Sequence, residues 1–200
     1  MMRLKDILTP FWRFRSDRKG NVVVETAIVT PFVLLAAFGA VDIVRYLNIQ
    51  ESVIRAANTT ADAIARQNGV TSSQVFSFLG HAESTINPDA TGGTALITVA
   101  SVHKEGSGAA EVSWRRDKSG GTPFSGACQQ VGSEGQAANL PDGFTLDSDE
   151  TVIIAEACYT FVPSFFVSRA IFDLDFVPLD IYGRSITAAR FGSLNIVSPG

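Results

Sequence analysis

The sequence predicts an α+β fold in which a long N-terminal helix packs on a small antiparallel β-sheet. Three observations lead to this prediction: an almost unbroken apolar run over residues 22–41, a helical spacing of apolar residues that continues to residue 67, and several short segments of strand character after residue 93. With 200 residues, 46% of them apolar, the chain is long enough for one folded domain and an anchor.

Charge divides the chain into a basic head and an acidic body. Residues 1–20 have a net charge of +4, and the remaining residues have a net charge of −8. A basic segment that precedes a membrane helix stays in the cytoplasm by the positive-inside rule, so we expect the body on the opposite side of the membrane. The negative body also argues against nucleic-acid binding, which depends on neutralising phosphates.

Residues 22–41 have the length of a membrane-spanning helix. About 20 apolar residues cross a hydrocarbon core of ~30 Å, and only Glu25, Thr26 and Thr30 are plainly polar in this run. Pro31 predicts a kink, which membrane helices tolerate better than soluble ones. We therefore expect a single transmembrane helix.

The helix is expected to continue beyond the membrane as an amphipathic segment. After residue 45, apolar side chains recur at steps of three and four residues, separated by charged ones, up to the stop signal Asn68-Gly69. The predicted organisation is a basic cytoplasmic leader over 1–20, a transmembrane helix over 21–44, an amphipathic continuation over 45–69 and an α+β domain over 70–200.

The remaining chain predicts one short helix and four strands. A capping box from Thr71 to Gln74 begins a helix that ends before Asn87-Pro88. In the strongest strand, alternation from Ile153 to Phe161 makes one apolar face and points Cys158 to the other. The expected strands are 94–105, 111–116, 151–163 and 180–192, with a long loop over 117–150 and a short helix or hydrophobic loop over 163–172.

Cys128 and Cys158 both lie in the body that this topology places outside the cytoplasm, where a disulfide is permitted. Closing a loop of about 30 residues would stabilise the fold by roughly 3–4 kcal/mol. The alternative is a pair of free buried thiols in a cytosolic domain.

The residue pattern contains little that indicates catalysis. Neither His81 nor His103 lies near another ligand type at metal spacing, and the expected disulfide consumes both thiols. The carboxylates of residues 147–150 could bind Ca²⁺ through oxygen ligands, but they lack the EF-hand spacing, and a solvated loop is the preferred interpretation. We therefore expect no enzyme, no cofactor and no metal.

Glu25 is the unusual residue of the predicted membrane helix. A carboxylate in lipid costs several kcal/mol unless a partner neutralises it. Glu25 lies only about one turn inside the apolar run, so one interpretation is that its side chain extends to the head-group region. The functional interpretation requires a partner for the charge.

The residues around Glu25 resemble a type IV prepilin processing signal, because a basic leader ends at Lys19-Gly20 and the glutamate follows five residues after the glycine. Residues 18–67 are similar to the TadE/TadG-like pilus-assembly family, and residues 151–191 resemble its C-terminal part loosely. The family pattern has a Glu, an Ala-hydrophobic pair, a Pro six residues after the Glu, and an acidic residue ahead of an Arg. In this chain these positions are Glu25, Ala27-Ile28, Pro31, Asp42 and Arg45.

The resemblance implies a pilin-like pseudopilin of the Tad (Flp) pilus system, held in the inner membrane with its C-terminal domain in the periplasm. Its implied partners are a prepilin peptidase, other Tad pilins or pseudopilins, and the pilus assembly platform. The peptidase would cut between Gly20 and Asn21. The new amine at Asn21 would be largely cationic at pH 7, so Glu25 of a neighbouring subunit could pair with it.

Major Flp pilins are much shorter and carry Tyr after the Glu, whereas Thr26 follows Glu25 here. The chain is therefore expected to be a minor or initiating subunit rather than the pilus shaft. Two alternatives stay open. One is a membrane-anchored periplasmic binding module that is neither processed nor assembled into a filament. The other is a secreted enzyme behind a signal peptide cleaved near Ala40.

Overall fold

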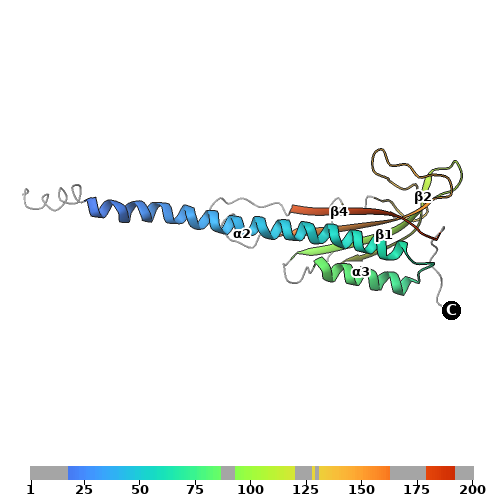
Figure 1. Ribbon diagram of the computed structural model, residues 1–200, viewed down its shortest axis with the longest axis horizontal. Helices are drawn as coiled ribbons and strands as arrows, with labels where there is room; N and C mark the ends of the chain where they lie inside the picture. Colours follow the sequence, from blue (N-terminus) through green and yellow to red (C-terminus); the bar gives the residue numbers. More distant parts are fainter. Residues whose placement is uncertain (1–17, 87–92, 120–127, 129–130, 163–178, 192–200) are drawn as a thin grey trace, which may run out of the picture. The chain divides into compact units, whose positions relative to one another are not determined.

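The computed structural model describes residues 18–86, 93–119, 128, 131–162 and 179–191. They form two compact units, one with the described residues up to Val44 and one with those from Arg45 onwards. The elements in chain order are α2 (Arg18–Ala65), α3 (Ser72–Ile86), β1 (Thr94–Lys104), β2 (Ala110–Ser119), β3 (Thr151–Phe161) and β4 (Leu179–Ala188) (Figure 1). The predicted α+β fold is confirmed.

α3 begins and ends where the local sequence signals predict, whereas α2 begins at Arg18, inside the predicted leader over 1–20. α2 is continuous through Pro31 and ends at Ala65, just before Gly69, which has the positive φ of 129° that favours glycine after a helix. At the start of α3, the N–H of Thr71 donates to Oε1 of Gln74 at 2.9 Å, and the N–H of Gln74 donates to Oγ1 of Thr71 at 3.3 Å. These reciprocal bonds form the expected capping box. A kink at Pro31 stays a prediction.

The four strands form one antiparallel sheet in the order β2-β1-β3-β4. A bulge interrupts the pairing of β1 with β2 next to Ser101, whereas β3 and β4 pair without a shift. β2 continues to Ser119 and so takes three residues from the predicted loop over 117–150. The predicted segment 163–172 lies outside the described residues.

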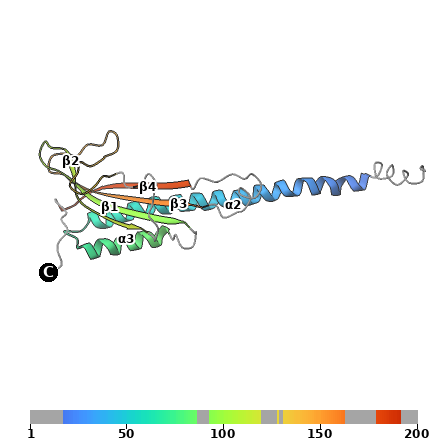
Figure 2. The ribbon, with the colours of Figure 1, turned by 180° about the vertical axis from the view of Figure 1, so that it is seen from behind.

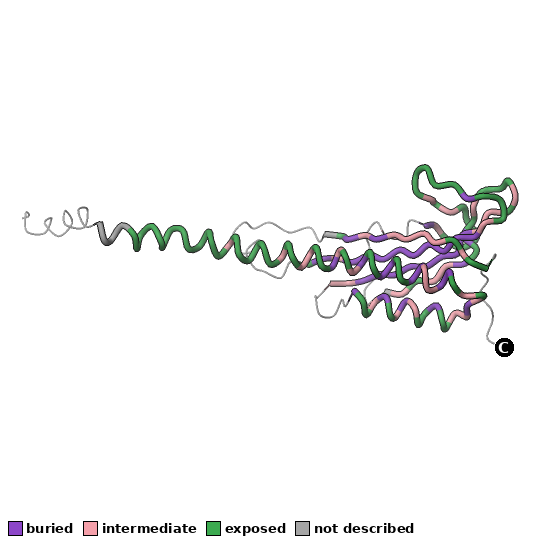
Figure 3. The backbone as a smooth tube through the Cα atoms, in the orientation of Figure 1, coloured by how far each residue is buried: buried purple, intermediate pink, exposed green. Residues whose placement is uncertain are grey.

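The sheet has an apolar core on each face. On one face, the part of α2 from Ile49 onwards and α3 pack against alternate strand residues such as Ile97, Ile153 and Tyr159 (Figures 1 and 2). On the other face, a smaller core is completed by Val131 and Leu146, among other residues. The exposed residues of the N-terminal part of α2 contrast with the buried strands in Figure 3. The alternation predicted for β3 is confirmed, since Ile153, Ala155, Ala157, Tyr159 and Phe161 all face the helices.

The approach of β4 to α2 depends on one glycine. A Cβ added to Gly183 would lie 3.2 Å from both the backbone N and Cα of Ile54. Contacts at this distance are tighter than side chains normally make, so any other residue would push the strand and the helix apart. Glycine at this position therefore sets the distance between β4 and the helix.

Candidate functional site

The N-terminal part of α2 carries the residues that are predicted to serve in leader cleavage and subunit pairing. Gly20 and Asn21 lie in the first turn of the helix, and Glu25 follows about one turn later. Val22, Val29 and their apolar neighbours along the helix are largely exposed. Within the described residues, α2 is the one helix long and apolar enough to cross a membrane, judged by length and composition. This indicates a single-pass membrane anchor.

The two hydroxyl groups near Glu25 are satisfied within the helix. Oγ1 of Thr26 donates to the carbonyl of Val22 at 2.8 Å, and Oγ1 of Thr30 donates to the carbonyl of Thr26 at 2.6 Å. Such bonds to the residue four positions earlier remove the need for an outside partner for a hydroxyl in an apolar environment. Glu25 is different: it is exposed and has no hydrogen bond or ion pair to any residue that the structure describes.

The expected disulfide between Cys128 and Cys158 is confirmed, with a Cα–Cα distance of 6.1 Å. Cys158 is 1% exposed and lies on the sheet face opposite the helices. The bond therefore fixes the chain at Cys128 onto that face. Its 30-residue separation corresponds to roughly 3–4 kcal/mol of stabilisation in the chain-entropy model.

A buried polar cluster on this same face was not predicted from the sequence. Glu156 in β3 is 1% exposed, and its register partner in β4 is Arg184. Nε of Arg184 lies 3.5 Å from Oε1 of Glu156, and the hydroxyl of Tyr182 donates to the same oxygen at 2.9 Å. Nη2 of Arg184 also donates to the carbonyl of Asn139, so the pair joins the sheet to the loop that covers it.

The environment of this cluster changes the acidity of Tyr182. Burial is the largest cause of its raised pKa, and the charge and hydrogen bond of Glu156 add to the effect. Arg184 acts in the opposite direction but does not cancel it. The phenol therefore stays protonated and donates to Glu156 over the whole neutral range.

The other side chains that could bind a metal ion form hydrogen bonds within the fold instead. The N–H of Asp147 donates to Oε2 of Glu150 at 2.9 Å, and Oδ1 of Asp149 accepts from the N–H of Gly106 at 3.4 Å. Nδ1 of His103 lies 2.9 Å from Oγ1 of Thr151. Across the part of the chain that the structure describes, no three His, Cys, Asp or Glu side chains are grouped so as to hold a metal ion.

The fold and the apolar helix together define a class: single-pass, helix-anchored proteins with an α+β domain. Within this class, residues 20–62 match the sequence model of the TadE-like protein family. The predicted resemblance to TadE-like pilus-assembly proteins is thus confirmed over this segment, which contains Gly20, Glu25, Pro31 and Asp42. No curated protein and no solved structure matches the chain significantly.

Proposed function

We propose that this protein is a minor pilin or pseudopilin of a Tad (Flp) pilus assembly machine. The chain is inserted in the inner membrane with residues 1–20 in the cytoplasm and the α+β domain in the periplasm. A prepilin peptidase cleaves the bond between Gly20 and Asn21. Glu25 of one subunit then pairs with the new N-terminal amine of its neighbour and sets the register between the two helices.

The observation that carries this proposal is the isolation of Glu25. Its carboxylate lies in an apolar, exposed helix segment without a partner among the described residues, while Thr26 and Thr30 satisfy their own hydroxyl groups. Burial of such a charge in lipid or between helices is favourable only with a compensating charge. Cleavage after Gly20 creates a cationic amine at Asn21, four residues before Glu25, on each subunit, which supports pairing between subunits.

Co-expression with the peptidase tests the cleavage step. The mass of the membrane-extracted protein should fall by the mass of residues 1–20, and Gly20→Ala should prevent the change. An intact N-terminus in assembled material would remove cleavage from the proposal.

Substitution of Glu25 tests the pairing step separately. Glu25→Gln keeps the size of the side chain and removes its charge, so the leader should still be cut while incorporation into the assembly falls at least tenfold. Glu51→Gln is the matched control, because Glu51 is an exposed carboxylate on the same helix that pairs with Arg55 in its own chain. Full function of the Glu25 variant would instead favour an anchored periplasmic binding module that is not assembled.

A further inference from the structure

The two edges of the sheet differ in how far the outward-facing backbone groups of the edge strand are covered. At β2, the segment 135–138 runs along the outer edge: the N–H of Val112 donates to Gln136 at 3.0 Å, and the N–H groups of Gly135 and Ala138 donate to Val112 and Ala110 at 2.8 Å. These bonds use the backbone groups through which another strand would pair. The loop therefore closes this end of the β2 edge.

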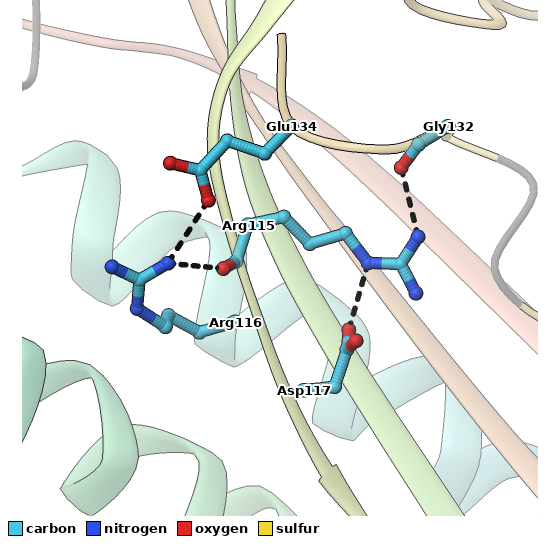
Figure 4. A network of polar contacts seen from close by, with 5 residues as sticks. All are labelled: Arg115, Arg116, Asp117, Gly132 and Glu134. Carbon is cyan, nitrogen blue, oxygen red and sulfur yellow. Dashed lines mark hydrogen bonds and ion pairs between the residues drawn. The ribbon is translucent and has the colours of Figure 1, made fainter. Parts of the chain in front are cut away.

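Charged side chains farther along β2 also oppose the pairing of another strand with its outer edge. Arg115 donates to Oδ1 of Asp117 at 2.9 Å and to the carbonyl of Gly132 at 2.8 Å, while Nη1 of Arg116 lies 3.2 Å from Oε2 of Glu134 (Figure 4). These contacts hold residues 132–134 beside the strand. A loop, a bulge and a run of charges are the devices by which natural sheets prevent edge-to-edge pairing.

Among the residues that the structure describes, β4 has no covering loop, no bulge and no run of charges. Its ten residues pair with β3 in one unbroken register, and no described residue outside β3 forms a backbone hydrogen bond with Leu179–Ala188. The strand contains no Pro and no Lys, and β-branched residues such as Ile186 and Thr187 favour pairing. Its two charges have partners in the chain: Asp180 accepts from Thr160 at 3.1 Å, and Arg184 lies against Glu156.

We propose that the outer edge of β4 is a docking site for an extended strand of a different protein subunit in the same membrane assembly. The added strand pairs through its backbone as a fifth strand of the sheet. Because Asp180 and Arg184 are already paired, the incoming strand is mainly uncharged and rich in β-branched residues. The closed β2 edge makes this sheet extension one-sided.

A second copy of this chain does not fit the site through its β4. Tyr46 packs edge-to-face on Phe161, which pairs with Leu179, and the N–H of Arg190 donates to Ala65. β4 therefore runs in the same direction as residues 45–65 of α2. Two-fold pairing of β4 with β4 would place the Arg45 ends of the two copies at opposite ends of the pair. In both copies, however, Arg45 directly follows the anchor, and both anchors enter one membrane from the same side.

A second copy does not fit through its β2 either. That strand has the correct direction, because neighbouring strands of the sheet alternate. However, the loop hydrogen bonds at Ala110 and Val112 and the charges of residues 115–118 oppose its addition to another sheet. The occupant is therefore a strand of a different subunit that is anchored from the same side of the membrane.

Photo-crosslinking in the full-length protein, co-expressed with the other components of its assembly, tests this inference. A photoreactive phenylalanine derivative replaces Asp180 in one variant and Ala188 in another, both exposed and at opposite ends of β4. The control is the same replacement at Ser113, an exposed residue at the bulge of β2. Mass spectrometry identifies the crosslinked peptide.

We expect both β4 positions to crosslink to one other subunit, at sites about eight residues apart, as a paired strand requires. The crosslinking yield from the variant at Ser113 should be at least several-fold lower. Crosslinks of this chain to itself, two unrelated partner sites, or equal yields from β2 would overturn the inference. Thr187→Lys, with Ser113→Lys as control, should lower co-purification of the partner without changing the melting temperature, and unchanged co-purification would also count against the site.

The identity of the bound subunit, as a member of a pilus assembly, rests on the proposed function. The docking edge itself does not. The two can fail separately: Gly20→Ala and Glu25→Gln report on cleavage and helix pairing, whereas the β4 crosslinks report on the sheet edge. Normal cleavage with no β4 crosslink would reject the docking site alone. A β4 crosslink to a subunit in a chain that is never cleaved would reject the pilin proposal alone.

Discussion

Glu156 offers the sharpest test of how the sheet is stabilised. Its carboxylate is 1% exposed and serves both Arg184, whose side chain is 12% exposed, and the hydroxyl of Tyr182. Glu156→Ala leaves the guanidinium without its counter-ion and the phenol without its acceptor. Removal of one member of a buried pair costs about 3–5 kcal/mol. Because Arg184 keeps its bond to Asn139, we expect a loss near the lower limit, about 3 kcal/mol.

Two further variants separate the charge from the packing. Glu156→Gln keeps an acceptor for Tyr182 but removes the charge, so we expect a loss of about 1.5–2 kcal/mol. Replacing both Glu156 and Arg184 with Met removes both buried charges and fills similar space. Since an apolar replacement of a whole buried pair is often neutral or stabilising, this variant should unfold within about 1 kcal/mol of the parent.

Urea unfolding in detergent measures these differences. Trp114 is 3% exposed in the core between the sheet and the helices, so its fluorescence reports on the domain once Trp12 is replaced by Phe. The midpoints should shift with constant m-values. A loss below 1 kcal/mol for Glu156→Ala, or a double variant as unstable as that single one, would refute the reasoning.

Three other predictions concern the same domain. Reduction of the Cys128–Cys158 bond should lower the free energy of unfolding by roughly 3–4 kcal/mol, and a melting temperature unchanged by reductant would contradict this. Gly183→Ala should cost about 1–3 kcal/mol, because the new Cβ lies 3.2 Å from backbone atoms of Ile54; unaltered urea unfolding would show that the helix moves freely. Because the pKa of Tyr182 is raised in the folded state, stability should be complete below the unfolded pKa of about 10 and fall as the pH rises above it, and Tyr182→Phe should flatten this alkaline loss in a pH series.

Local signals in the sequence predicted most elements of the fold. The capping box at Thr71, the stop at Gly69 and the alternation of β3 each depend on residues within one turn or one strand of each other. The predicted end of β2 at residue 116 was wrong, because the charged residues that follow were interpreted as part of a loop. An edge strand can carry such charges, since Lys118 on one face pairs with Glu83 of α3 at 2.7 Å while Asp117 on the other pairs with Arg115.

The cluster around Glu156 could not be predicted in the same way. The residue stands between two alanines in a strongly apolar strand, and Arg184 follows 28 positions later. Their contact depends on the register of β3 with β4, which places the two residues opposite each other. A register is set by packing against α2 and by the whole ladder, not by residues close to either side chain. The glutamate alone was the available signal, because a buried carboxylate requires a partner somewhere in the fold.

The same requirement, applied to Glu156 and to Glu25, leads to different partners. Glu156 has its cation within the domain, at 3.5 Å on the neighbouring strand. Glu25 has no such cation among the described residues, and the helix around it uses its hydroxyl groups for its own carbonyls. A cation contributed by another subunit would satisfy Glu25 only where two helices lie in register. If Glu25→Gln lowers assembly while Glu156→Gln lowers only the stability of the domain, the first carboxylate acts between subunits and the second within one.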